Sequence, residues 1–178
     1  MNRNNFVLWF CGLSGSGKTT LSKMLYDYFR KSGRTVEHLD GDSIRDLLNV
    51  HEFTHEGREM HLKRVAHTAS LLEKHGVTVV ASFISPYAES RNWARSQCRD
   101  FIEIYLSTSL TECESRDVKG LYKKARRGDI KNFTGIDSKF EPPENPEIVI
   151  DTENQTPQES VDIITRYLLS RILRVKPG

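Results

Sequence analysis

The chain has 178 residues, which suits a single domain over residues 1–178 with a buried core that needs no disulfide or metal. Its formal net charge of +2 argues against a general nucleic-acid-binding protein, and no apolar run reaches the roughly 18 residues of a membrane span. The three cysteines lack the spacing of a metal site or a disulfide framework, so we expect a cytoplasmic protein without nucleic-acid or membrane partners.

The first predicted elements are a strand, a loop and a helix. The apolar run 6–11 predicts a buried strand, and the helical spacing of Leu21 and Leu25 predicts a helix that stops near Gly33. Between them, residues 12–19 read Gly-Leu-Ser-Gly-Ser-Gly-Lys-Thr, a complete G-x-x-x-x-G-K-[ST] motif. This strand–loop–helix setting is the one in which the motif binds phosphate.

Each residue type in this motif has a chemical task. The glycines let consecutive backbone N–H groups turn inward and cradle phosphate oxygens, helped by the positive end of the following helix. Lys18 is expected to reach the β- and γ-phosphates, and the Thr19 hydroxyl to bind Mg²⁺. We therefore predict a nucleoside triphosphate site made of Gly12, Leu13, Ser14, Gly15, Ser16, Gly17, Lys18, Thr19 and Thr20.

Strands and helices alternate along the rest of the chain. Apolar runs predict strands at 35–39, 77–83, 101–106 and 148–150, and helical patterns predict helices at 43–48, 56–75, 89–98 and from 156 onward. The last helix has a clear start, with Thr156 as N-cap, Pro157 in the first position and Glu159 three residues on. The alternation predicts an α/β fold, a five-stranded parallel sheet with helices on both faces that binds ligands at the carboxyl ends of its strands.

Two acidic residues that end apolar strands are candidates for the metal site. Asp151 follows the run 148–150, where an ordinary turn residue is the alternative. Asp40 is followed by Gly41, Asp42 and Arg45, a polar group that no core strand end requires. We favour Asp40, because a carboxylate there can orient a Mg²⁺-bound water or accept the proton of an attacking hydroxyl.

A basic segment spans about residues 116–137. Gly120 and Gly128 interrupt its lysines and arginines, and the aromatic residues Tyr122 and Phe133 flank them. We predict a lid that brings positive charge over a polyphosphate, against the alternatives of a solvated surface or a nucleic-acid site.

Further residues are candidates for the acceptor site. Ser85 follows a central strand and directly precedes a proline, so it is either a turn residue or a hydroxyl that bonds to the acceptor or takes up phosphate. Phe53, Arg58 and His61 are placed to line an acceptor pocket. The six histidines show no metal-ligand spacing, and the N-K-x-D motif that reads guanine is missing from the sequence, which argues against a GTPase.

Together these motifs give the chain a close resemblance to the adenylylsulfate (APS) kinases over about residues 6–155. That family transfers the γ-phosphate of ATP to the 3′-hydroxyl of APS and makes 3′-phosphoadenosine 5′-phosphosulfate (PAPS) during sulfate activation. The motifs that carry the resemblance occur in order as Gly12-Leu-Ser-Gly-Ser-Gly-Lys-Thr19, Asp40-Gly-Asp-Ser-Ile-Arg45, Phe83-Ile-Ser-Pro86, Lys119-Gly-Leu-Tyr-Lys-Lys-Ala125, Lys131-Asn-Phe-Thr-Gly-Ile-Asp137 and Glu141-Pro-Pro-Glu-Asn-Pro146.

The resemblance implies an ATP- and Mg²⁺-dependent enzyme, commonly a homodimer, and assigns roles to particular positions. Lys18, Asp40 and Ser85 would be catalytic, with Asp40 as general base and Ser85 at the position described as a phosphoserine. Thr19 and Asp40 would serve the metal, and Gln155 would lie near the ATP adenine. The acceptor would bind at Asp40, Gly41, Asp42, Arg45, Phe53, Arg58, His61, Ile84, Ser85, Lys119, Asn132 and Phe133.

Two positions depart from the family pattern. Gly57 stands where the family has an Asp, and His61 stands where it has an Asn that binds the acceptor. A neutral histidine still donates one hydrogen bond and accepts one, so APS binding is compatible with it. The departures favour one alternative, a related kinase with another nucleotide-like acceptor. A second alternative, of another class, is a weakly active nucleotide-binding partner of a sulfurylase, and the presence of Lys18, Asp40, Arg45 and Lys119 argues against it.

Overall fold

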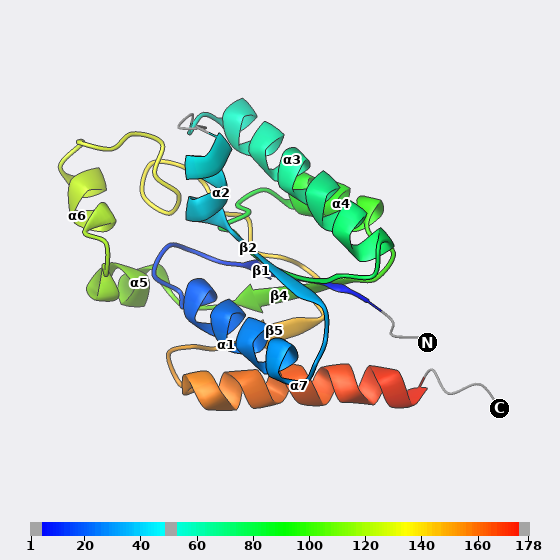
Figure 1. Ribbon diagram of the computed structural model, residues 1–178. Coiled ribbons are helices and arrows are strands. Elements are labelled where there is room, and N and C mark those ends of the chain that lie inside the picture. Colours follow the sequence, from blue (N-terminus) through cyan, green and yellow to red (C-terminus); the bar gives the residue numbers. More distant parts are fainter. Residues whose placement is uncertain (1–4, 49–52, 175–178) are drawn as a thin grey trace.

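The structure is a computed structural model that describes residues 5–48 and 53–174. Its centre is one parallel five-stranded sheet in the order β2-β3-β1-β4-β5 (Figure 1). The strands are β1 (Val7–Cys11), β2 (Val36–Asp40), β3 (Thr78–Ser82), β4 (Phe101–Leu106) and β5 (Ile148–Ile150). The predicted α/β architecture is confirmed, and each strand bound lies within one residue of its predicted position.

The central strand β1 supplies both cores of the fold, because successive side chains of a strand point to opposite faces. Leu8 and Phe10 pack beneath α1 (Lys18–Lys31) and α7 (Pro157–Arg174). Val7 and Trp9 pack on the other face, beneath α3 (His55–Lys74) and α4 (Ala88–Gln97). Figure 1 shows these two helix layers on opposite sides of the sheet. All five side chains of β1 are buried, so its carboxyl end is a rigid base for the loop that follows.

A side-chain cap sets the start of α7 as predicted. The backbone N–H of Thr156 donates to Glu159 Oε2 at 2.8 Å, and the N–H of Glu159 donates to Thr156 Oγ1 at 3.3 Å, a reciprocal capping box at the start of α7. Helix α2 (Gly41–Leu48) begins two residues earlier than predicted. The reason is that the Asp40 carboxylate accepts the N–H groups of Asp42 and Ser43 and so caps the helix itself.

The basic segment is more ordered than its sequence suggested. Helix α5 (Leu110–Arg116) precedes it and α6 (Leu121–Arg126) lies within it, and neither helix was predicted. A small apolar cluster, which we call the lid core, consists of Leu13, Cys113, Tyr122, Ala125 and Phe133. The lid core packs the basic segment onto the phosphate loop. Across the described ranges, no helix is long and apolar enough to cross a membrane.

Candidate active site

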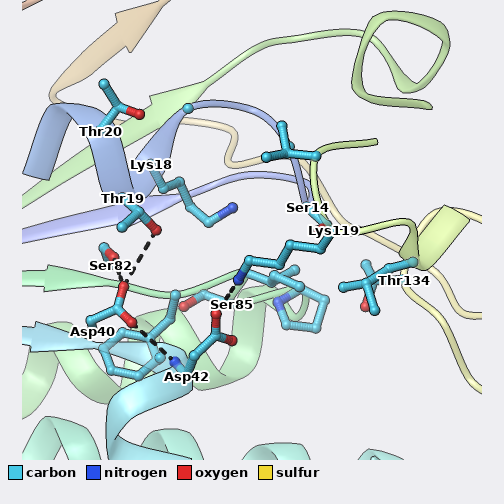
Figure 2. A pocket seen from close by; sticks show the side chains of 18 of the residues that line it. Ser14, Lys18, Thr19, Thr20, Asp40, Asp42, Ser82, Ser85, Lys119 and Thr134 are labelled. Atoms are coloured by element: carbon cyan, nitrogen blue, oxygen red, sulfur yellow. Dashed lines mark hydrogen bonds and ion pairs between the residues drawn. The ribbon is translucent and has the colours of Figure 1, made fainter. Parts of the chain in front are cut away.

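A cavity of about 910 Å³ lies at the carboxyl ends of β1, β2 and β3, the edge at which parallel α/β sheets bind ligands. Its walls come from the phosphate loop, the start of α2, the ends of β2 and β3, helix α3 and the basic segment. Figure 2 shows side chains from these separate elements pointing toward one another.

The phosphate loop takes a backbone path that needs glycine. Gly15 has φ +78°, in the left-handed region, and a Cβ there would lie 3.0 Å from the carbonyl oxygen of Cys113. At Gly12, with φ +148°, a Cβ would lie 3.0 Å from the carbonyl oxygen of Leu106. The loop is therefore pressed against the backbone of its neighbours, which leaves no space for a side chain at either position.

Lys18 lies curled within this loop. Its ammonium donates to the carbonyl oxygens of Gly12 at 3.0 Å and Leu13 at 2.6 Å, and the residue is 9% exposed. Burial lowers the pKa of Lys18 to about 8, because desolvation disfavours the charged form. Among the described residues, the ammonium bonds only to these two carbonyls and to the Ser16 hydroxyl, all within the loop. Because Lys18 lines the cavity, an anion bound there would compete with these groups for the ammonium.

Three residues that were not predicted as site residues brace the loop from outside. The Thr152 hydroxyl donates to the Ser16 carbonyl at 3.0 Å, and Arg116 donates to the hydroxyl and the carbonyl of Thr152 at 3.0 and 2.8 Å. The Tyr122 hydroxyl donates to the Ser14 carbonyl at 2.9 Å. Arg116 was visible only as the first cation of the basic segment, and no sequence signal connects it to residues so distant in the chain.

Asp40 faces the loop from the end of β2. Its Oδ1 accepts from Ser82 Oγ at 3.1 Å and from Thr19 Oγ1 at 3.4 Å (Figure 2). Asp151, the other candidate, accepts instead from the Glu153 N–H at 3.0 Å and from Asn154 Nδ2 at 2.7 Å, and it does not line the cavity. The structure thus places Asp40 at the phosphate loop and Asp151 in a local turn.

The oxygens of Thr19 and Asp40 suit a small hard cation. Mg²⁺ prefers oxygen ligands and commonly takes one or two carboxylates beside substrate phosphates and waters, so a full cage of protein ligands is not needed. In the described part of the chain no group of three or more His, Cys, Asp or Glu residues is arranged to hold a metal. With only the Thr19 and Asp40 oxygens from the protein, phosphates and waters would fill the other positions around such a cation.

Arg58 ties the opposite wall of the cavity to the basic segment. Its Nε donates to the Phe53 carbonyl at 3.1 Å, and its terminal nitrogens donate to Thr134 Oγ1 and to the Asn132 carbonyl. The Arg45 guanidinium lies 4.9 Å from the centre of the Phe53 ring, so that an aromatic face with a cation over it borders the cavity.

His61 is a buried polar group that lacks a partner. Its side chain is 1% exposed, it lines the cavity, and neither ring nitrogen has a hydrogen-bond partner among the residues that the structure describes. Burial, together with the charges of Arg45 and Arg64, lowers its pKa to about 4. The imidazole is therefore neutral near pH 7 and offers one donor and one acceptor, which a ligand or water would satisfy.

Two polar groups complete the cavity. The Ser85 hydroxyl accepts from the indole N–H of Trp9 at 2.9 Å. Lys119, from the basic segment, forms an ion pair with Asp42 at the start of α2 (Figure 2). Both side chains of this pair are more than half exposed, so solvent still reaches the cavity at the ion pair.

Comparison with known proteins agrees with this geometry. The family model for adenylylsulphate kinase matches residues 4–151. The chain belongs to the adenylylsulphate kinase family. The adenylyl-sulfate kinase of Oceanobacillus iheyensis is 49% identical over 170 residues, 94% of this chain and 85% of that one.

Solved structures of APS kinases have the same fold. The Mycobacterium tuberculosis APS kinase, solved with AMPPNP and APS, matches with a TM-score of 0.88 and 37% identity over 93% of this chain and 98% of that one. A hexameric APS kinase from Thiobacillus denitrificans matches with a TM-score of 0.71 and 28% identity over 95% of this chain and 29% of that one.

Most of the site residues that the phosphate-loop motif and the APS kinase resemblance predicted line one cavity. Four do not: Gly12, Leu13, Ser16 and Asn132. Leu13 packs into the lid core, Ser16 is fully buried within the loop, and Asn132 gives its carbonyl to Arg58. The residues that do line it are Ser14, Gly15, Gly17, Lys18, Thr19, Thr20, Asp40, Gly41, Asp42, Arg45, Phe53, Arg58, His61, Ile84, Ser85, Lys119, Phe133 and Gln155.

Proposed function

We propose that the chain is an ATP-dependent adenylylsulfate kinase, which phosphorylates the 3′-hydroxyl of APS to give PAPS in sulfate activation. One observation carries the proposal: a single cavity joins a phosphate loop and Asp40 to a separate polar and aromatic wall. We call residues 12–20, Asp40 and Gln155 the donor half, and Asp42, Arg45, Phe53, Arg58, His61 and Ser85 the acceptor half. A kinase needs both halves in one enclosure, since the two substrates must meet within it.

The donor half suits ATP. Loop N–H groups would cradle the phosphates, and Lys18 would exchange its carbonyl partners for phosphate oxygens. Thr19 and Asp40 would hold Mg²⁺, which supplies positive charge to the phosphate oxygens when bound. Gln155 lines the same cavity near Thr152, where the adenine would lie.

Asp40 is the group we assign as general base. The N–H groups of Asp42 and Ser43 at 3.3 and 3.5 Å and the Ser82 hydroxyl fix its carboxylate in the direction of the loop. The carboxylate would accept the proton of the attacking 3′-hydroxyl, while Lys18 and Lys119 stabilise the charge on the transferring phosphoryl group.

The acceptor half suits a nucleotide with a charged 5′ group. Phe53 and Phe133 border the cavity as aromatic surfaces for a base, and Arg45 and Arg58 supply positive charge. The basic segment 116–137 would act as a lid that excludes water and limits ATP hydrolysis. We also infer a single cytoplasmic kinase domain that assembles as a homodimer, as is common in the family.

His61 motivates a second candidate, a kinase with a different nucleotide-like acceptor. Its two unpartnered ring nitrogens lie where the family pattern has Asn, so the group they recognise need not be that of APS. Nothing in residues 5–48 and 53–174 favours the third alternative, a weakly active partner of a sulfurylase.

The test is an ADP-release assay on the purified chain with ATP and Mg²⁺, with and without APS, and mass spectrometry of the product. We expect APS-dependent ADP release and a 3′-phosphorylated product. Lys18→Ala, purified in parallel, controls for contaminating kinases. ATP binding without a response to APS would overturn the proposal, and activity on another member of a nucleotide panel would then support the second candidate.

A further inference from the structure

Ser85 has a backbone conformation that residues with a side chain rarely adopt. Its φ is +47°, in the left-handed region, and the residue is 2% exposed. Such a conformation costs free energy and persists only where the surroundings hold it. Contacts from neighbouring elements must therefore hold residues 84–86 in this turn.

Arg91, on the first turn of α4, supplies the main contacts. Its NH1 donates to the Ser85 carbonyl at 2.7 Å, and its NH2 donates to the Glu141 carbonyl at 2.8 Å. Its Nε pairs with Glu103 on β4 at 2.9 Å. The guanidinium is 3% exposed and does not line the cavity, so all three nitrogens serve the protein itself.

The partners of Arg91 are themselves fixed. Arg95 pairs with Glu103 at 3.3 Å and with Glu147 at 2.6 Å, which holds the Glu103 carboxylate from its other side. The Glu141 N–H donates to the Pro86 carbonyl at 2.8 Å, and Glu141 Oε2 accepts the Ala88 N–H at 2.9 Å. The turn is thus clamped between β4, α4 and the loop that follows the basic segment.

The hydroxyl of Ser85 is oriented by the same clamp. An indole N–H can only donate, so in the 2.9 Å bond to Trp9 the Ser85 oxygen is the acceptor. Among the described residues no group accepts its own proton, and Ser85 lines the cavity. The neighbouring Ile84 carbonyl accepts the Gly12 N–H at 3.3 Å, which connects the turn to the phosphate loop.

We propose that Arg91 is a positioning residue for the acceptor: it holds residues 84–86 in the left-handed turn, so that the Ser85 hydroxyl, anchored on Trp9, donates a hydrogen bond to the acceptor nucleotide. The inference rests on the proposed function. It assigns Ser85 the part of a hydrogen-bond donor in substrate binding, fixed from behind by a buried cation that never touches the substrate.

The test is a double-mutant cycle of Arg91→Lys and Ser85→Ala, with kcat and KM measured separately for APS and ATP. Lysine keeps the charge opposite Glu103 but cannot bridge both carbonyls. We expect Arg91→Lys to lower kcat/KM for APS about tenfold and to leave the KM for ATP within about twofold. In the Ser85→Ala background, Arg91→Lys should lower kcat/KM for APS less than about twofold, because the hydroxyl that Arg91 positions is already absent.

Arg171→Lys is the matched control, because it makes the same change in an ion pair, with Asp100, that belongs neither to the clamp nor to the cavity. It should leave kcat/KM for APS unchanged. Binding of an ATP analogue and the melting temperature establish that each variant is folded. If Arg91→Lys fails to fold, the charge-balanced pair Arg91→Met with Glu103→Gln takes its place in the cycle.

Equal losses in both Ser85 backgrounds, or wild-type APS kinetics in Arg91→Lys, would overturn the inference while the proposed function stands. A wild-type chain that is inert toward APS would overturn both.

Discussion

The two halves of the cavity differ in how their polar groups are satisfied. In the donor half, Lys18 bonds to loop carbonyls, Asp40 bonds to Thr19 and Ser82, and Arg116 with Thr152 braces the loop from outside. The acceptor half contains His61, whose two buried ring nitrogens lack partners in the described part of the chain.

This difference indicates where specificity lies. A site whose polar groups bond to one another is formed before the ligand arrives and binds any ligand with the right phosphates. A buried polar group without a partner favours a ligand that satisfies it and disfavours one that does not. Changes in the donor half should therefore affect every reaction of the chain, and changes in the acceptor half should affect one acceptor relative to another.

The largest effect is expected for Lys18→Ala, which should lower kcat about a thousandfold by removing a cation from the developing phosphoryl charge. The loss should appear with every acceptor. Lys23→Ala, on the exposed face of α1, is the matched control. A loss of activity in Lys18→Ala that is confined to APS would contradict the division into halves.

The pH dependence of the wild type gives a second check on Lys18. Because the pKa of Lys18 is lowered to about 8, kcat/KM for ATP should fall as pH rises through that value.

Asp40→Asn should reduce kcat about a hundredfold and leave ATP binding nearly intact. Asparagine still accepts the N–H groups that start α2, so the change removes the negative charge and keeps the helix cap. Asp151→Asn is the control and should keep wild-type turnover. Near-normal turnover in Asp40→Asn, measured by steady-state kinetics alongside calorimetric ATP binding, would move the assignment to Asp151.

His61→Phe should raise the KM for APS about tenfold, since it removes both hydrogen-bonding nitrogens from a buried position, and the KM for ATP should not change. His61→Asn restores the residue of the family pattern and should retain APS binding. The lowered pKa of His61, about 4, also predicts no contribution from its titration to the KM for APS between pH ~6 and ~8. An unchanged KM in His61→Phe would show that the acceptor does not use these nitrogens.

The smallest effect is expected at the ion pair of Lys119 with Asp42. Both side chains are exposed, so Lys119→Ala should change the free energy of unfolding by less than about 0.5 kcal/mol. It should lower kcat/KM for APS about fivefold at low salt and less at high salt, because exposed charges are screened. Lys123→Ala, on α6, is the control for charge alone. A large stability change would show that the pair is structural.

Much of the fold was predictable because its signals are local. Strand β1 is a continuous apolar run, and the start of α7 has its capping residues at the required spacing. Helix α5 also has a local signal, since Ser109 accepts the Glu112 N–H, but with 7 residues the helix is too short to show an apolar period. Helix α6 follows Gly120, which makes no side-chain cap bond. The Asp117 carboxylate accepts the N–H groups of Tyr122 and Lys123 instead, from further back in the chain than a usual N-cap residue, so the start of the helix is hard to place from sequence.

The site residues likewise separate into those with a local sequence signal and those whose contacts depend on the folded chain. Asp40 was predictable because an acid at the end of an apolar strand must lie at the carboxyl edge of the sheet. The bond from Thr152 to Ser16 joins residues 136 positions apart, and such contacts depend on tertiary packing alone. The contacts of Phe133, which the resemblance placed in the acceptor site, likewise depend on tertiary packing. Phe133 lines the cavity but also packs edge-on against Tyr122, with ring centroids 5.0 Å apart.

The bond between Trp9 and Ser85 also gives the chain an optical reporter. The sequence has two tryptophans, and Trp9 is fully buried and stacked on Phe83, with ring centroids 5.5 Å apart. A ligand that engages the Ser85 hydroxyl changes the polarisation of the group bonded to the indole. Indole emission responds to such a change, so acceptor binding should be readable by intrinsic fluorescence without turnover. Replacing Trp93, on α4, by Phe would leave Trp9 as the only tryptophan, so that the indole emission reports on this position alone.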